Sequence, residues 1–418
     1  MSVDPGRTVR ELQELRALTG DENGAQRECW TPTWAVARAW LGEKIAAVPG
    51  VVYEVDEAGN AWATLAGASD RAVLIGGHID SVPNGGWLDG CLNLVAGLEV
   101  LRRIAAEAAA GSPPPVAVRL VDWADEEGSR FGRSLLGSAA AAGQLDPDAV
   151  RGLTDRAGIV LADALAAHGV SVDRMGEARR QLATAAAYLE LHIEQGPVLE
   201  GLGLPLGAVL GTVGVERNVI RFTGQAAHSG STPMAARRDA FAAAAKLGLE
   251  IREIARRHGG VCTVGSCVTR PGIVTAVVGE CDITLDQRNF DAGKLAAMLA
   301  DAQAAAQRFA AEERVEVAWT PTWRIPPIPF HPHLVDLCDE AIREDAGGRS
   351  HRLPSGPLHD AASVALAGVP TVMLFVQSLR GLSHNPAEDT KVEHLELCVE
   401  ALDRLATKTI DWVATGAA

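Results

Sequence analysis

The chain of 418 residues lacks the sequence features of several large classes of protein. No apolar run approaches the ~20 residues that a membrane-spanning helix requires, and the first residues contain no apolar core of a secretory signal. The 38 Lys and Arg are outnumbered by 53 Asp and Glu, and the net charge of −15 disfavours nucleic acid or an anionic membrane as a partner. We therefore expect a cytoplasmic protein that binds neither.

Cysteine is also scarce. The seven cysteines are odd in number and scattered, and none has the Cys-x-x-Cys spacing of a redox or structural zinc motif. This usage predicts reduced, mostly packed thiols in a cytoplasmic protein. Hydrophobic residues make up 47% of the chain and charged residues 22%, which is a globular balance. A chain of this length predicts two domains.

The most informative stretch follows an apolar run, Val73–Ile75, that is typical of a buried strand. A glycine-rich loop containing His78, Asp80 and Asp89 comes next, and Cys91–Ala110 then has the apolar periodicity of a helix. Open α/β sheets bind ligands at the carboxyl ends of their strands. An imidazole and two carboxylates there indicate a metal site with a supporting carboxylate. Taken alone, a solvent-exposed loop is the commoner explanation of a His-x-Asp pair.

Three later segments repeat this arrangement, with a possible metal ligand at or after an apolar strand. They are Glu126 and Glu127 after Val116–Val121, His192 within Tyr188–Ile193, and His384 after Val369–Val376. Each alone has an ordinary explanation, as a solvated loop or a core histidine. Jointly, three imidazoles and several carboxylates at the strand ends of one domain suit two Zn²⁺-, Mn²⁺- or Co²⁺-like ions, which can hydrolyse an amide-type bond. One of the adjacent glutamates can then ligate while its neighbour moves protons.

From about Val215 the pattern changes to strand, helix, strand, strand, helix, strand, which is the ferredoxin-like order. The expected elements are Asn218–Thr223, Pro233–Arg257, Val261–Val268, Gly272–Phe290, Ala292–Glu312 and Val315–Thr320. This predicts an inserted α+β domain over residues 215–330, between the two parts of a discontinuous catalytic domain, 1–214 and 331–418. Strand alternation places Arg288 away from the core, where it can meet a ligand. His228 lies in a Gly/Ser loop before the first helix, usually a solvent-facing position.

Seven stretches carry a family resemblance: GGHIDSVPNGGWLDG, DWADEEGSRFGRSLLGS, LELHIEQGPVLE, AAHSGSTPM, LDQRNFD, HDA and GLSHNPAEDT. They resemble the metal amidohydrolases related to zinc aminopeptidases, and within them the hydantoinase/carbamoylase-type N-carbamoyl-L-amino-acid hydrolases, β-ureidopropionases and allantoate amidohydrolases. The resemblance covers nearly the whole chain. It implies an α/β, zinc-aminopeptidase-like catalytic domain with a mixed, mostly parallel sheet, an inserted ferredoxin-like dimerisation or lid domain, and a homodimer.

The resemblance also implies roles for individual residues. The metal ligands would be His78, Asp89, Glu127, His192 and His384, with Asp89 bridging two divalent ions (Zn²⁺, Mn²⁺, Co²⁺ or Ni²⁺) per chain. Glu126 would be the general base and Asp80 the carboxylate that orients His78. In the inserted domain, His228 would polarise the scissile carbonyl of the neighbouring chain's substrate, and Arg288 would pair with a substrate carboxylate. Further substrate contacts would come from Gln195, Thr275 and His359.

The sequence departs from the family pattern at four positions. Thr275 stands where an Asn is usual, Gln287 where an Ile is usual and Leu358 where a Gly is usual, and Trp87 is bulkier than expected beside the metal loop. None of them removes a ligand, and together they suggest a pocket reshaped for an unusual amide or ureide.

Three functions stay open at this point. The favoured one is hydrolysis of a small N-carbamoyl or ureido acid. A second is an N-acyl-amino-acid deacylase or dipeptidase of the same fold, against which Gln195 counts. The third is a non-catalytic metal- or ligand-binding dimer, whose sign would be the loss of Glu126 or of a ligand. The sequence shows no such loss.

Overall fold

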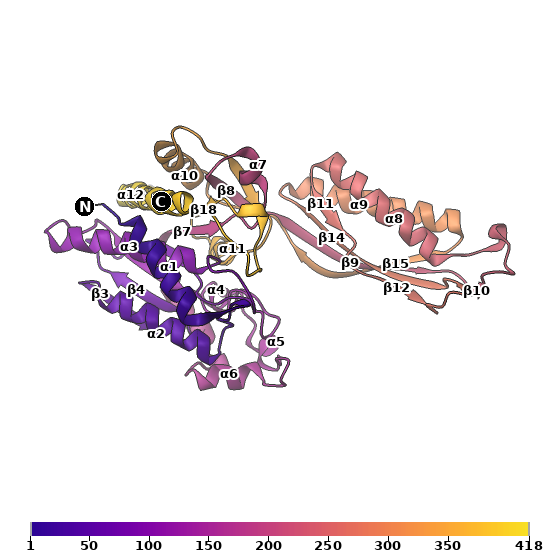
Figure 1. Cartoon of the computed structure of the whole chain (residues 1–418), viewed down its shortest axis with the longest axis horizontal. Coiled ribbons are helices and arrows are strands. Elements are labelled where there is room, and N and C mark those ends of the chain that lie inside the picture. Colours follow the sequence, from indigo (N-terminus) through magenta and orange to yellow (C-terminus); the bar gives the residue numbers. More distant parts are fainter. Residues whose placement is uncertain (1, 417–418) are drawn as a thin grey trace. The chain divides into compact units, whose positions relative to one another are not determined.

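The computed structural model describes residues 2–416. The chain divides into two compact units, shown in Figure 1. Unit 1 comprises Met1–Gly211 and Pro329–Ala418, and unit 2 comprises Thr212–Ile328.

Unit 1 is built on a nine-stranded mixed sheet of order β16-β8-β18-β7-β5-β6-β4-β3, with β17 beside β8. The four central strands β18, β7, β5 and β6 run parallel and are buried almost throughout, as strands covered on both faces must be. The strands are β3 (Val51–Val55), β4 (Ala61–Leu65), β5 (Ala72–Gly77), β6 (Ala117–Asp122), β7 (Ala185–Ile193), β8 (Leu206–Thr212), β16 (Ile328–Pro329), β17 (Arg352–Ser355) and β18 (Thr371–Val376).

Helices cover both faces of this sheet. On one face lies α3, whose Gly97 sits where an added Cβ would come within 2.7 Å of Leu120 and 2.8 Å of Ile75, so only glycine permits this close packing. On the other face α11 reaches Glu190 of β7 through the backbone N–H of Ala361. The α-helices are α1 (Pro5–Thr19), α2 (Pro32–Ala46), α3 (Cys91–Ala109), α4 (Leu136–Ala141), α5 (Pro147–Arg151), α6 (Leu161–Ala167), α7 (Val198–Leu202), α10 (Pro332–Asp345), α11 (Asp360–Leu366) and α12 (Val392–Ala414).

Unit 2 is an antiparallel sheet of order β11-β14-β9-β15, with β12 also beside β14, packed against α8 and α9. This is the ferredoxin-like order that the sequence predicts. Leu247 and Met298 of the helices bury against Phe222 and Ile283 of the sheet. The elements are β9 (Gly214–Thr223), β10 (Ala227–His228), α8 (Ala240–His258), β11 (Val261–Thr263), β12 (Cys267–Arg270), β13 (Ala276–Val277), β14 (Glu280–Asn289), α9 (Ala292–Glu313) and β15 (Glu316–Ile325).

Several expected boundaries are wrong. The first helix of unit 2 begins at Ala240 and not at Pro233, because the side chain of Asp239 accepts hydrogen bonds from the N–H groups of Phe241 and Ala242 and caps the helix there. The two long strands that the sequence predicts after this helix are each divided, at Gly265 and Gly279, because glycine weakens the interior of a strand. In unit 1 the sequence does not predict β8, β17 or α11.

The described residues include no helix that is both long and apolar enough to span a bilayer.

Candidate metal centre

The four strand ends singled out in the sequence meet at one edge of the unit 1 sheet. His78 follows β5 directly, His192 is the penultimate residue of β7, and Glu126 and Glu127 follow β6. His384 lies beyond β18, after the short 3₁₀ turn Leu379–Gly381. The strands are parallel neighbours, so their carboxyl ends lie at the same edge, where open α/β sheets bind ligands.

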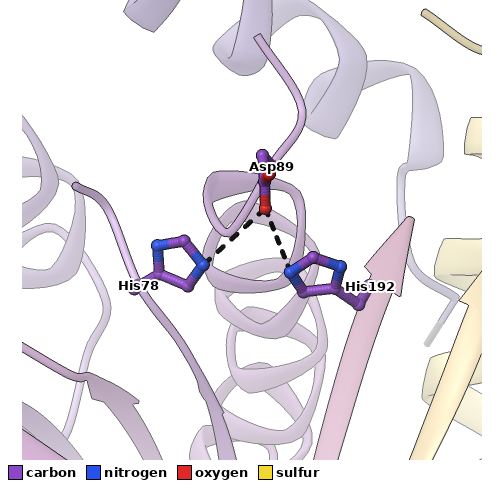
Figure 2. Close-up of side chains that lie close together, drawn as sticks. All are labelled: His78, Asp89 and His192. Atoms are coloured by element: carbon purple, nitrogen blue, oxygen red, sulfur yellow. Dashed lines mark ion pairs between the residues drawn. The ribbon is translucent and has the colours of Figure 1, made fainter. Parts of the chain in front are cut away.

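Asp89 is the centre of this group. Figure 2 shows its carboxylate between His78 and His192. Oδ1 lies 3.1 Å from Nε2 of His192 and 3.8 Å from Nε2 of His78. Oδ2 lies 3.4 Å from Nε2 of His384. The two oxygens of one buried carboxylate therefore face different histidines, which is the arrangement of a bridging ligand.

Glu126 and Glu127 each lie close to one of the histidines around Asp89. Oε2 of Glu127 lies 3.2 Å from Nε2 of His384, and Oε2 of Glu126 lies 3.7 Å from Nε2 of His78. The His384 side chain is 50% exposed, whereas those of His78 and His192 are at most 2% exposed. Water and small molecules therefore reach the centre from the His384 side.

Asp80 fixes the orientation of its neighbours. Its backbone oxygen lies 3.1 Å from Nδ1 of His78 and its carboxylate 3.5 Å from the same atom. The same carboxylate accepts the N–H groups of Glu126 and Glu127, at 3.4 and 3.2 Å. With Nδ1 donating to oxygen, the imidazole of His78 presents Nε2 to the centre.

Glycine is required where the metal loop turns into α3. Gly90 has φ +67°, and a Cβ there would lie 2.3 Å from the ring of His78. Both the left-handed backbone and the contact with the imidazole exclude other residues. The expected glycine-rich support of His78 is thus physically explained.

The pKa values of several side chains at the centre are strongly shifted. Burial raises the pKa of Glu126 well above its ordinary value, opposed by His78 and reinforced by Glu127. Burial would also raise the pKa of Asp89, but hydrogen bonds from His192 and His384 hold it well below the ordinary value. Hydrogen bonds to Asp89 and Glu127 raise the pKa of His384 to about 11. Bound metal ions would take the place of the protons on these side chains, because histidines and carboxylates bind a metal in their deprotonated form.

The donor set fits a pair of divalent ions. Two groups whose ligand atoms lie within 4.8 Å of one another share Asp89, and all their donors are imidazole nitrogens or carboxylate oxygens. Oε1 of Glu127 is buried and has no hydrogen-bond partner among residues 2–416, which is costly unless a cation contacts it. The two groups are His78, Asp89 and His192, and Asp89, Glu127 and His384.

Gln195 and His359 also lie in unit 1, beside the same residues. Nε2 of Gln195 donates to Oδ2 of Asp89 and to Oγ of Ser383, both at 2.9 Å. His359 is 2% exposed, its Nε2 lies 2.9 Å from Oγ of Ser355, and its ring centroid lies 4.4 Å from that of His192. Burial and then His192 hold the pKa of His359 well below its ordinary value, so its imidazole is neutral.

Two of the unit 2 residues lie together. His228 is exposed, and its Nδ1 accepts the N–H groups of Gly230 and Ser231, which leaves Nε2 to carry the ring proton. Its backbone pairs with Ala276, the residue after Thr275. His228 and Thr275 thus occupy one end of the unit.

Arg288 lies at the other end of unit 2, where β14 pairs with Val215. The sequence predicts that its side chain is available to a ligand, but in the structure the side chain is paired. Its Nε bonds Oδ1 of Asp286 at 2.9 Å, since strand alternation places both side chains on one face. The eight residue-to-residue steps of β14 from Glu280 to Arg288 span about 25 Å. Arg288 is therefore far from His228 within this unit.

Two of the four departures from the family pattern have structural partners. Gln287 is buried on the face opposite Arg288, and its Nε2 donates to Glu216 at 3.0 Å. Trp87 is 8% exposed, and the guanidinium of Arg16 lies 5.6 Å from its ring centre. The side chain of Gln287 is therefore held inside unit 2, and its effect on a substrate pocket stays a prediction.

Sequence reasoning missed Glu388. Its buried carboxylate accepts the N–H groups of Leu88 and Asp89, at 3.1 and 3.0 Å. The only signal was its position four residues after His384, within a stretch that was assigned to His384 alone.

This fold and donor set define the class of metal-dependent hydrolases built on a zinc-aminopeptidase-like domain. Residues 74–408 match the family described as Peptidase family M20/M25/M40, and the chain belongs to it. It is 37% identical over 361 residues to an N-carbamoyl-L-amino acid amidohydrolase of Geobacillus stearothermophilus, covering 84% of this chain and 85% of that protein. It is 34% identical over 387 residues to the allantoate amidohydrolase of Escherichia coli, covering 91% of each.

Solved structures agree. A hydantoinase/carbamoylase family amidase from Burkholderia multivorans superposes with a TM-score of 0.87 at 31% identity, covering 96% of this chain and 97% of that one. A second amidase of that family, from Burkholderia ambifaria, has a TM-score of 0.86 at 33% identity and covers 97% of both chains. The expected family, the zinc-aminopeptidase-like fold of the catalytic domain and the hydrolase activity are thereby confirmed, and dimerisation through the inserted domain stays a prediction.

Metal analysis tests the shared carboxylate. We predict about two ions per chain in the loaded protein, with activity lost on chelation and restored by Mn²⁺, Co²⁺, Ni²⁺ or Zn²⁺. Asp89→Ala should lose both ions, because both ligand groups contain Asp89, whereas His192→Ala should keep one. Elemental analysis of dialysed protein measures the difference. Equal metal content in the two variants would contradict a bridging role, and full turnover by metal-free protein would contradict the centre itself.

Proposed function

We propose that the protein hydrolyses the linear amide C–N bond of a small N-carbamoyl amino acid or a related ureide, releasing ammonia, carbon dioxide and an amino acid. The observation that carries this proposal is the Asp89 carboxylate facing two ligand groups, with a further buried glutamate, Glu126, beside them. The named relatives act on N-carbamoyl-L-amino acids and on allantoate. Both substrates contain a ureido group and a carboxylate.

Divalent ions bound at Asp89 would supply Lewis-acid polarisation of the ureido carbonyl and of water. The chain's own contribution is the proton transfer. Glu126 is buried and lies beside His78, and burial raises its pKa, which suits a group that takes a proton from water and delivers it to the leaving amine. Glu127 instead contacts His384 and has an oxygen without a hydrogen-bond partner among the described residues, which suits a ligand.

Ammonia release distinguishes this activity from those of the same fold. With Mn²⁺, Zn²⁺ or Co²⁺ added, we expect release from N-carbamoyl amino acids or a ureide to exceed cleavage of the matching N-formyl, N-acetyl and dipeptide compounds. Glu126→Gln should keep its metal while losing at least ~10²-fold in turnover, and Glu127→Gln should lose metal. Faster cleavage of acetyl or dipeptide compounds would favour the deacylase or dipeptidase, and the reverse pattern of variants would exchange the two glutamates.

We infer that Arg288 binds the substrate carboxylate through its paired guanidinium donors. Its present partner, Asp286, is also held by Nε of Arg217 at 2.7 Å. Asp286 would therefore keep an ion pair when Arg288 turns to a substrate, so the exchange leaves no carboxylate unpaired.

Substrate charge tests Arg288. In Arg288→Ala, KM for a carboxylate substrate should rise by ~10-fold or more, while a neutral amide analogue should be nearly unaffected. Arg217→Ala is the matched control, since it removes the other partner of Asp286. Equal losses for charged and neutral substrates would show that Arg288 is structural.

We further propose that His228 acts in the active site of a neighbouring chain, in a homodimer formed through unit 2. His228 and Arg288 lie at opposite ends of one unit, about 25 Å apart along β14, too far for one copy of the unit to place both on a small substrate. Two copies related by a twofold axis can supply one residue each. The protonated Nε2 of His228 suits polarisation of a carbonyl oxygen.

Complementation between two inactive variants tests whether His228 acts in the active site of the neighbouring chain. Glu126→Ala and His228→Ala should each be inactive alone, and after dissociation and re-pairing together they should recover roughly a quarter of wild-type activity. About half of the dimers are then mixed, and each of these contains one intact site. Mixed dimers confirmed by mass that remain inactive would show that His228 serves its own chain.

A further inference from the structure

We propose that Glu388 is a positioning residue that joins the His384 loop to the Asp89 loop and thereby sets the affinity of the Asp89–Glu127–His384 half of the centre for its ion. The inference rests on the proposed two-ion centre.

Glu388 contacts both loops with one carboxylate. Oε1 accepts the N–H groups of Leu88 and Asp89, and Oε2 lies 3.0 Å from Oγ of Ser383, the residue before His384. These loops are 300 residues apart in the chain. Glu388 is 2% exposed, and a buried carboxylate is tolerated only when it is hydrogen-bonded, which the two N–H groups donated to Oε1 provide here.

The Asp89 loop is shaped around this carboxylate. A Cβ on Gly86 would lie 2.0 Å from Glu388, so any other residue would displace the carboxylate or the loop. The absence of a side chain at Gly86 therefore lets the Glu388 carboxylate approach the loop that carries Asp89.

The support is directed at one oxygen of the bridging carboxylate. Oγ of Ser383 lies 2.8 Å from Oδ2 of Asp89, the oxygen that faces His384. Oδ1, which faces His78 and His192, is not among the contacts of Ser383. Loss of Glu388 should therefore disturb the His384 side of the centre before the His192 side.

The His384 loop also needs an external hold. His384 has φ +53°, in the left-handed region that residues other than glycine seldom adopt, and such a conformation persists only where surrounding contacts fix it. His78 and His192, by contrast, are each fixed through Nδ1 by a backbone oxygen of their own segment. Glu388 and Ser383 supply this hold to the His384 loop.

The test measures the two ions separately. Titration of metal-free protein with Zn²⁺ or Mn²⁺ against a chromophoric chelator gives two affinities. In Glu388→Ala we expect the ion that His384→Ala also weakens to lose ~10–100-fold in affinity, while the other ion changes little. Glu388→Gln keeps an oxygen for the two backbone N–H groups and should recover most of the loss. Glu396→Ala, an exposed glutamate of α12, is the matched control.

Each other outcome overturns the inference. Unchanged affinities in Glu388→Ala would remove any positioning role. Equal weakening of both ions, together with a lower unfolding temperature of the metal-free protein, would make Glu388 a general structural residue. If Glu388→Ala does not fold, Ser383→Ala must weaken the same single ion, and wild-type affinities there would refute the inference. A wild-type protein that binds fewer than two ions would instead contradict the proposed centre, so the two failures are distinguishable.

Discussion

The metal centre of unit 1 is arranged around one buried carboxylate that contacts three imidazoles. Asp89 faces His78 and His192 with one oxygen and His384 with the other. Burial alone would protonate such a group, and only the cationic partners keep its pKa low. The same atoms can bind divalent ions in place of protons, because metal ligands are deprotonated when they bind.

This carboxylate sets the demands on the surrounding loops. It must lie where parallel strand ends converge, and it must leave both oxygens accessible from opposite sides. Gly90 and Gly86 meet the steric part of this demand, because a Cβ at either would collide with His78 or Glu388. Asp80 and Glu388 meet the polar part, since each carboxylate accepts two backbone N–H groups from a ligand loop. The loops are thus held by two carboxylates that are not themselves members of the two ligand groups.

The sequence predicted the parts of this arrangement that follow from local pattern. Apolar strands that contain or precede His, Asp or Glu indicated every residue of the two ligand groups, because parallel strands bring their ends together whatever their separation in the chain. It could not predict contacts that depend on three-dimensional proximity alone. Glu388 lies 300 residues from the N–H groups that it accepts, and the pairing of Arg288 with Asp286 depends on side-chain conformation. The predicted start of α8 at Pro233 was wrong because the helix is capped six residues later, by the side chain of Asp239.

The burial of the four unusual residues indicates which of them can contact a substrate directly. Of the four unusual residues, Gln287 is committed to Glu216 inside unit 2 and Trp87 is buried under Arg16. Thr275 is exposed, beside His228, and Leu358 is half-buried next to His359. An exposed or half-buried side chain can contact a substrate directly, whereas a buried one acts through its neighbours. The search for the natural substrate should therefore begin with what Thr275 and Leu358 allow beside a ureido group.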